Sequence, residues 1–184
     1  IHQHVLKNTP RGNVKYVYVD VEASGLNTVA STIYQKSVVI PETGTFKWYI
    51  NTGVSNAELP SEDALYYLLF GDVNRTDGKS LNELKSLFRK IYQNPDIDEA
   101  VATLKEHFGV TDPRIEIIPV KSEAELLSSS LEFAKSQRPP GGSIKYRMYN
   151  GLSYDVELLN NRARQLGVKD YNISKYAVED TMQL

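Results

Sequence analysis

One apolar run near the start of the chain constrains the fold more than any other feature. Residues 15–21 alternate along a stretch rich in Val and Tyr, which predicts a central β-strand. The run leads into Asp20 and Glu22. Because side chains on a strand alternate between faces, these two carboxylates share one face, about 7 Å apart. Val17, Val19 and Val21 then occupy the opposite, buried face.

Further β-type runs build a sheet around this strand. Ile33–Ile40 and Thr45–Asn51 are joined by Pro-Glu-Thr-Gly, which indicates a hairpin. Three antiparallel strands are therefore predicted to open the domain. Residues 144–149 form another strand after a Pro- and Gly-rich loop, and a short β-type run lies near Val178.

Three amphipathic helices occupy the middle of the chain. Ser80 and Glu83 form a capping box that begins the first, in which apolar residues recur at helical spacing. The second ends at Gly109, a favourable C-terminal cap. The third follows Ser122, with Glu125 completing another capping box.

Two other segments complete the pattern of elements. The apolar run 115–120 is interrupted by Pro119, which disfavours a strand there. After the strand at 144–149, apolar residues at helical spacing define a helix that closes at Gly167. This order of elements predicts an α/β fold with a mixed sheet and flanking helices.

Composition excludes several classes of protein. The 184 residues suit one domain, and the absence of cysteine excludes disulfides, thiol catalysis and zinc–thiolate sites. No apolar stretch is long enough to span a bilayer, so we expect a cytoplasmic protein with no membrane partner. The net charge of −2 argues against a broadly basic nucleic-acid binder. It does not exclude a nucleic-acid enzyme, because bound metal ions can supply the local positive field.

A third carboxylate is placed to join the first two. Asp155 lies in the first turn of its helix, just after the strand at 144–149. If that strand runs parallel to and beside the first, their carboxyl ends meet at one edge, and Asp155 faces Asp20 and Glu22. Oxygen ligands without a Cys or His cluster favour Mg²⁺ or Mn²⁺ over Zn²⁺. Two such ions support phosphodiester cleavage.

Each of these features has an ordinary structural interpretation when taken alone. An acidic pair at a strand end is most often solvated, and Asp155 is a favourable residue for the first turn of a helix. Their combination, in order and on suitable elements, indicates a metal-dependent nuclease.

Two segments resemble motifs of the DnaQ-like (DEDD) 3′–5′ exonuclease superfamily. Residues 17–26, read as VYVDVEASGL, resemble the first motif, an apolar strand running into Asp-x-Glu-x-(Thr/Ser)-Gly-Leu. Residues 149–159 resemble the second, Asn-x-x-x-(Phe/Tyr)-Asp-x-x-x-Leu, and Asp180-Thr181 resembles the end of a strand that follows it. The resemblance implies a ribonuclease-H-like fold.

The resemblance also implies roles for individual residues. Asp20 would bridge two divalent cations, Mg²⁺ or Mn²⁺, while Glu22 holds the cation that activates water and Asp155 holds the other. Backbone amides of the first motif would lie near the 3′ end of the substrate, with Leu26 against its base. The residues implied to contact the terminal nucleotide are Ser24, Gly25, Leu26, Asn150 and Tyr154.

The chain departs from the superfamily pattern in its third motif. That motif supplies a His or Tyr general base and a fourth carboxylate, normally well beyond the Asp-Thr strand. Tyr176 and Asp180 match the form Tyr-x-x-x-Asp, but they lie close after Asp155. We therefore expect the single domain 1–184 to be incomplete at its C-terminal end and, as it stands, inactive or severely impaired.

A second departure is the wide separation of the first two motifs. Residues 61–111 are predicted to form a helical insertion within the domain. Its basic residues either contact a nucleic-acid backbone or form the solvated face of amphipathic helices.

The leading hypothesis is a 3′–5′ exonuclease acting on single-stranded 3′ ends, with DNA favoured over RNA. It is either a standalone enzyme or the proofreading part of a fused or associated polymerase. One alternative is a non-catalytic nuclease fold that binds nucleic acid or a protein, and another is an RNA-directed exonuclease. An unrelated α/β domain with coincidental motifs is the third.

Overall fold

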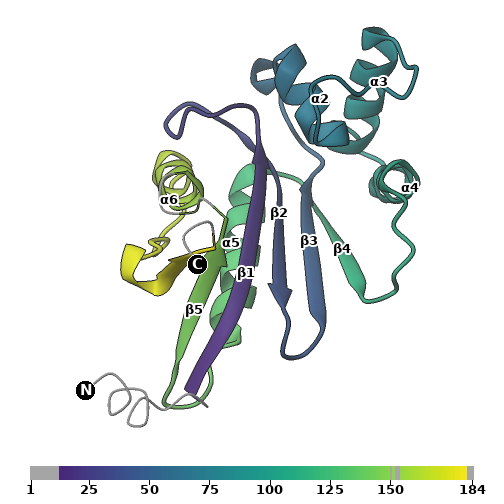
Figure 1. Cartoon of the computed structure of the whole chain (residues 1–184). Coiled ribbons are helices and arrows are strands. Elements are labelled where there is room, and N and C mark those ends of the chain that lie inside the picture. The colour runs from purple at the N-terminus through teal and green to yellow at the C-terminus, as the bar shows by residue number, and fades with distance from the viewer. Residues whose placement is uncertain (1–12, 150, 152–153, 182–184) are drawn as a thin grey trace.

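A six-stranded mixed sheet organises the chain (Figure 1). The computed structural model describes residues 13–149, 151 and 154–181. The strands lie in the order β4-β3-β2-β1-β5-β6. Their bounds are β1 Val14–Ala23, β2 Ile33–Ile40, β3 Thr45–Asn51, β4 Ile115–Val120, β5 Ser143–Met148 and β6 Val178–Asp180. The helices are α2 Glu62–Phe70, α3 Leu81–Tyr92, α4 Ile97–Phe108, α5 Glu123–Ser136 and α6 Asp155–Gln165, with 3₁₀ turns η2 at Asn56–Glu58 and η3 at Lys175–Ala177.

Strand pairing agrees with the sequence prediction. β1 pairs with β2, and β2 with β3, in antiparallel fashion. On its other side β1 pairs with β5 in parallel, and β5 pairs with β6 in parallel. The three opening antiparallel strands and the parallel neighbour of the first strand are therefore confirmed.

The run 115–120 corrects one expectation. It forms β4, which is parallel to β3, with Pro119 opposite Ile50. β4 is the outermost strand on its side of the sheet, so it pairs with one neighbour only. A proline is tolerated on such an edge, because its missing N–H need not complete hydrogen bonding on both sides.

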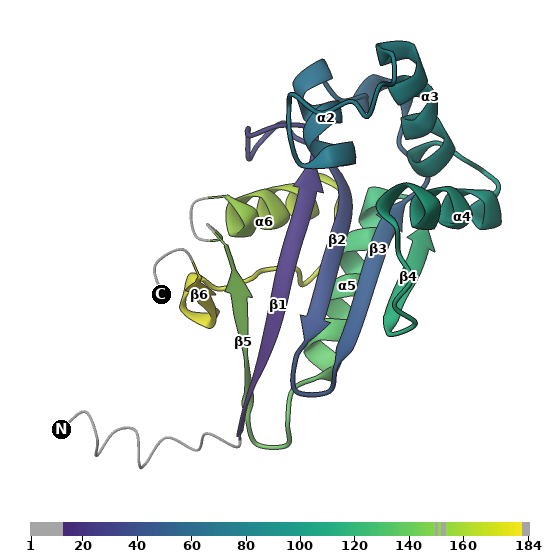
Figure 2. The ribbon, with the colours of Figure 1, turned by 45° about the vertical axis from the view of Figure 1, so that its right-hand side comes forward.

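The helices form two groups around the sheet. Figures 1 and 2 show α5 crossing one face and α6 beside β1 and β5, while α2, α3 and α4 gather towards one end of the sheet. The valines of β1 pack with the apolar residues of α5 and α6 in one core cluster. A second cluster joins β2 and β3 to α2, α3 and α4. None of the helices in the described part of the chain is long and apolar enough to span a membrane.

Helix caps follow the predicted chemistry with one exception. The Ser80 hydroxyl accepts from the Glu83 amide, and the Glu83 side chain accepts from the Ser80 amide, so this capping box is complete. Gly109 caps α4 with a φ of 64°. At α5 the Ser122 hydroxyl accepts from Glu125 as predicted. The Glu125 carboxylate instead accepts from the amide of residue 121, so the second half of that box is not formed.

A buried ion pair fixes α6 to the rest of the fold. Arg162 on α6 donates to both carboxylate oxygens of Glu123 at the start of α5. The same Glu123 accepts from the backbone amide of Ile33 at 2.9 Å, at the start of β2. The Arg162 and Glu123 side chains are only 12% and 6% exposed. α6, α5 and β2 are thus held in one arrangement by a single charged group.

Replacing Arg162 tests this anchor. Arg162→Met leaves Glu123 buried without its cation, so we expect the free energy of unfolding to fall by about 3 kcal/mol. Arg164→Met is the matched control on the same helix. Within the described residues, Arg164 is exposed and donates to Asn161, so its replacement is expected to change stability by less than about 0.5 kcal/mol. Urea unfolding measures both, and equal losses in the two variants contradict the anchoring role.

Candidate functional site

Three acidic side chains lie at the carboxyl end of β1. Asp20 and Glu22 alternate with Val19 and Val21, which are 4% and 6% exposed, so the carboxylates point away from the core face. β1 and β5 are parallel neighbours, and α6 follows β5 with Asp155 as its first residue. The predicted parallel geometry therefore brings the beginning of α6 to the end of β1.

The carboxyl groups influence one another electrostatically. Asp155 is 4% exposed, and burial, followed by the charges of Asp20, Glu22 and Asp180, raises its pKa to about 7. Burial, followed by the Asp20 charge, raises the pKa of Glu22 to about 7. Burial also raises the pKa of Asp20, and a backbone hydrogen bond from Val21 partly offsets this increase. The structure thus gathers the three predicted carboxylates, together with Asp180.

The donor set matches a divalent cation in its chemistry but not in its arrangement. All of these donors are carboxylate oxygens, which suit Mg²⁺ or Mn²⁺. In the rotamers of the described residues, however, no group of three or more His, Cys, Asp or Glu side chains is arranged to hold a metal ion. Like charges without a counter-ion repel one another. These carboxylate oxygens therefore suit a hard cation, but the described side chains are not arranged to coordinate one.

The loop after β1 is fixed by hydrogen bonds on both sides. The Ser24 hydroxyl accepts from the Thr32 amide at 2.9 Å, and the Tyr154 hydroxyl donates to the Gly25 carbonyl oxygen at 2.5 Å. Leu26 is 89% exposed at the tip of this region. These four predicted substrate contacts lie next to Glu22, whereas Asn150 lies outside the described residues.

A pocket of about 550 Å³ opens between the end of β1 and helix α2. Glu22, Leu26 and Tyr154 line one side, and Asp63 and Tyr67 of α2 line the other. Its remaining lining residues are Val21, Ala23, Gly25, Ser61, Ala64 and Gly71. The volume is typical of a small-molecule or nucleotide site. Sequence reasoning assigned α2 to an insertion and missed its contribution, because no local signal places a helix face opposite a distant strand.

The candidate third motif is only partly brought to the site. Asp180 is 6% exposed on β6 and acts electrostatically on Asp155. Tyr176 lies on η3 with 93% of its surface exposed. The Asp180 carboxylate is therefore buried and acts on Asp155, whereas the Tyr176 phenol is exposed to solvent.

Lys36 is a buried basic residue of β2 that sequence reasoning also missed. It is 1% exposed and lies opposite Val21 in the β1–β2 register, so it shares the core face. Its ammonium group donates to the Tyr171 hydroxyl at 3.3 Å. Burial lowers the pKa of Lys36 to about 7, and the Asp155 charge opposes that shift. The available signal was a lysine within a strand of otherwise uncharged residues, Ile33–Ile40.

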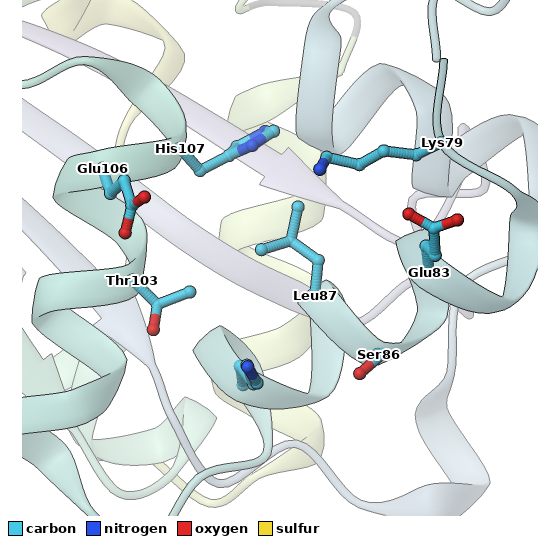
Figure 3. Close-up of a pocket in the computed structure, with 8 residues that line it drawn as sticks. Lys79, Glu83, Ser86, Leu87, Thr103, Glu106 and His107 are labelled. Atoms are coloured by element: carbon cyan, nitrogen blue, oxygen red, sulfur yellow. The ribbon is translucent and has the colours of Figure 1, made fainter. Parts of the chain in front are cut away.

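A separate pocket of about 540 Å³ lies between α3 and α4, away from these carboxylates (Figure 3). Lys79 and Lys90 line it together with Glu83 and Glu106, so its charges are mixed. The His107 ring nitrogen lies 2.7 Å from a backbone carbonyl of α2, a structural contact.

The other basic residues of α3 point elsewhere. Lys85 and Arg89 line a smaller pocket between α2 and α3. Lys90 of α3 lines the other pocket, together with Lys79 just before the helix, so these cations are divided between two pockets. This division favours the solvated-face interpretation over a track for a nucleic-acid backbone.

Comparison with known proteins supports the fold. No family model and no curated protein matches the sequence. Among solved structures, the chain is similar to exonuclease I in its apo form, with a TM-score of 0.55 and 14% identity over 93% of this chain and 30% of that chain. A product-bound exonuclease I gives a TM-score of 0.48 at 14% identity, over 83% of this chain and 26% of that one.

These findings establish the class of fold. With its order of antiparallel and parallel strands and its flanking helices, the chain has the ribonuclease-H-like fold predicted from the sequence. Within that class, it is similar in fold to the apo exonuclease I structure. The chain spans less than a third of the length of that exonuclease I chain, since the match covers 30% of it.

The acidic group predicts a pH dependence of stability without metal. Because Asp155 and Glu22 have pKa values raised to about 7 from 3.8 and 4.5, the folded protein binds protons there that the unfolded chain has released. Their contribution to the free energy of unfolding therefore falls as pH rises between about 4 and 7.

Asp155→Asn removes one of these titrations. In a chelating buffer, we expect this variant to lose less stability than the unaltered protein between about pH 5 and about pH 7.5, measured by urea unfolding. Glu106→Gln, at an exposed position on α4, serves as the control and should follow the unaltered protein. Parallel pH profiles for all three proteins contradict the prediction.

Proposed function

We propose that this chain is a metal-dependent 3′–5′ exonuclease domain that hydrolyses phosphodiester bonds from the 3′ end of a single strand. The supporting observation is the gathering of Asp20, Glu22 and Asp155 beside a nucleotide-sized pocket, on the fold of exonuclease I. DNA is the favoured substrate, with RNA as an alternative. That the domain works with a fused or associated polymerase is a prediction based on the resemblance of residues 149–159 to the second motif.

The proposed chemistry assigns a task to each acidic residue. Two divalent cations, Mg²⁺ or Mn²⁺, supply when bound an activated water and a stabilised leaving oxygen. Asp20 would hold both cations, while Glu22 would hold one of them and Asp155 the other. The raised pKa values of Glu22 and Asp155 are consistent with a site in which an external positive charge would relieve repulsion.

The pocket residues would orient the strand. The Tyr154–Gly25 hydrogen bond holds the loop after β1 against the beginning of α6, so its backbone keeps one position. Leu26 and Tyr67 expose 89% and 55% of their surfaces at this pocket. Exposed apolar and aromatic groups of this kind bind unpaired bases by contact and stacking.

A binding module without catalysis is the second candidate. It is favoured by the separation of the described carboxylates from coordination geometry and by the exposure of Tyr176, the candidate base. Such a protein would bind a single strand and leave it intact.

Asp20→Asn distinguishes these two functions. With 5′-labelled single-stranded DNA and Mn²⁺, we expect a ladder shortened from the 3′ end, reduced at least about 100-fold in rate by Asp20→Asn. Asp98→Asn, at an exposed position on α4, should retain the full rate. A matching RNA strand tests the alternative substrate.

The two candidate functions predict different outcomes in this assay. Cleavage that survives both a chelator and Asp20→Asn contradicts the proposed site. Binding of the strand without any cleavage supports the second candidate.

Tyr67 provides a test of the pocket. Loss of one base stack costs about 1–3 kcal/mol, so Tyr67→Ala should weaken binding of a single-stranded 3′ end by about 10-fold. Tyr67→Phe keeps the ring and should bind normally. Fluorescence anisotropy in the Asp20→Asn background measures binding without cleavage. Equal affinities for the Ala and Phe variants rule out stacking at this position.

A further inference from the structure

The face of β1 that points away from the core carries aromatic side chains as well as carboxylates. Tyr16 and Tyr18 alternate with buried valines, so they share the face of Asp20. Along the strand, Tyr18 lies about 7 Å and Tyr16 about 14 Å before Asp20. Helix α5 lies behind β1 and β5 in the view of Figure 1, so this face of the two strands is turned towards the viewer. A row of side chains therefore leads away from the candidate site over an open part of the sheet.

The neighbouring strands add basic side chains to this row. In the parallel register of β1 and β5, Lys145 lies opposite Tyr16, and Arg147 lies opposite Tyr18. The Arg147 guanidinium is 3.9 Å from the centre of the Tyr16 ring and donates to the Tyr18 hydroxyl at 2.9 Å. Arg147 also forms an ion pair with Glu179 of β6 at 2.9 Å. These contacts fix the two tyrosine rings in place on the surface of the sheet.

The 3₁₀ turn η3 extends the same surface at the edge of the sheet. The ammonium group of Lys145 donates to the backbone carbonyl oxygen of Tyr176 at 2.9 Å. Tyr176 exposes 93% of its surface and Tyr16 exposes 37%. Lys175, the first residue of η3, is exposed as well. We call this surface the open-face patch, and its members are Tyr16, Tyr18, Lys145, Arg147, Lys175 and Tyr176.

The open-face patch carries positive charge that nearby carboxylates do not fully neutralise. Arg147 is paired with Glu179, whereas Lys145 and Lys175 take part in none of the ion pairs formed by the described residues. The whole chain, by contrast, has a net charge of −2. Cations beside exposed aromatic rings suit a single nucleic-acid strand, because phosphates bind the cations and unpaired bases stack on the rings.

The candidate site lies between this patch and the pocket at α2. Along β1 the tyrosines come first, the carboxylates follow, and the pocket with Leu26 and Tyr67 lies beyond them. A strand whose 3′-terminal nucleotide occupies the pocket would have its next phosphate at the carboxylates. The rest of that strand would then continue over Tyr18 and Tyr16.

We propose that the open-face patch binds the part of a single nucleic-acid strand that lies upstream of its 3′-terminal nucleotide. The rings of Tyr16 and Tyr176 stack with unpaired bases, and Lys145 and Lys175 bind phosphates. Arg147 orders the tyrosine rings from within the sheet. The direction of the strand rests on the proposed function, whereas binding of a single strand to the patch does not.

Oligonucleotide length tests the proposal in the Asp20→Asn background, where cleavage does not interfere. Fluorescence anisotropy is measured with 5′-labelled single-stranded DNA of about 3 and about 12 nucleotides. Tyr16→Ala should weaken binding of the longer strand about 10-fold and leave the shorter one unchanged, because only the longer strand reaches the patch. Tyr16→Phe keeps the ring and should bind both strands normally. Equal affinities of the Ala and Phe variants for the longer strand overturn the proposal, as does an equal loss on both lengths.

Tyr176→Ala guards against an effect of folding. Its ring is almost fully exposed, so its removal leaves the packing of the protein intact. This variant should also lose affinity for the longer strand only. Equal binding of the longer strand by Tyr176→Ala and Tyr176→Phe overturns the stacking role of this ring.

The salt dependence of binding tests the contribution of charge. Loss of one phosphate contact makes the slope of log affinity against log salt less steep by about 0.7 for a single strand, so Lys145→Gln should show this change with the longer DNA. Lys105→Gln, at an exposed position on α4, is the matched control and should keep the slope of the unaltered protein. An unchanged slope for Lys145→Gln, or an equal change in both variants, overturns the proposed phosphate contact.

Failure of this proposal can be distinguished from failure of the proposed function. If the protein with Asp20 intact cleaves the longer strand and every patch variant binds it normally, the patch is overturned and the exonuclease stands. If the patch variants lose affinity for the longer strand but no protein cleaves it, the patch is supported and the exonuclease is contradicted. Absence of any strand binding overturns the patch and indicates a protein partner for this surface.

Discussion

The parallel pairing of β1 with β5 is the constraint on which the candidate site depends. It sets the carboxyl ends of two strands side by side, although their sequences are separated by most of the chain. Because α6 begins a few residues after β5, this pairing brings Asp155 to Asp20 and Glu22. The Arg162–Glu123 ion pair then fixes α6 against α5 and β2. The site is thus a consequence of sheet topology, stabilised by one buried ion pair.

Burying carboxylates in the fold is electrostatically unfavourable unless positive charges compensate them. The buried carboxylates Glu123 and Asp155 differ in this respect. Glu123 is compensated directly by Arg162, at hydrogen-bonding distance. Within the described part of the chain, Asp155 forms no ion pair of this kind, and the charge of the buried Lys36 only partly opposes the increase in its pKa. A site that keeps part of its repulsion is suited to binding a cation, since an external charge then relieves it.

Helix α2, which lies in the segment predicted to be an insertion, forms one wall of the candidate pocket. The region 61–111 carries α2, α3 and α4, and only α2 borders the pocket that contains Glu22. It supplies Tyr67 opposite Leu26, which suits an unpaired base more than a rigid duplex. The end of β1 supplies Glu22, and α2 completes the wall of the pocket.

Local patterns in the sequence determined most of the elements. Alternation predicted β1, a capping box predicted the beginning of α3, and Gly109 the end of α4, because each depends on neighbouring residues only. Tertiary structure decided what depends on strand order and register. It made 115–120 an edge strand despite its proline, buried Lys36 on the core face opposite Val21, and set α2 across the pocket. Such meetings of distant residues leave no periodic trace in the chain, since they arise only when the sheet assembles.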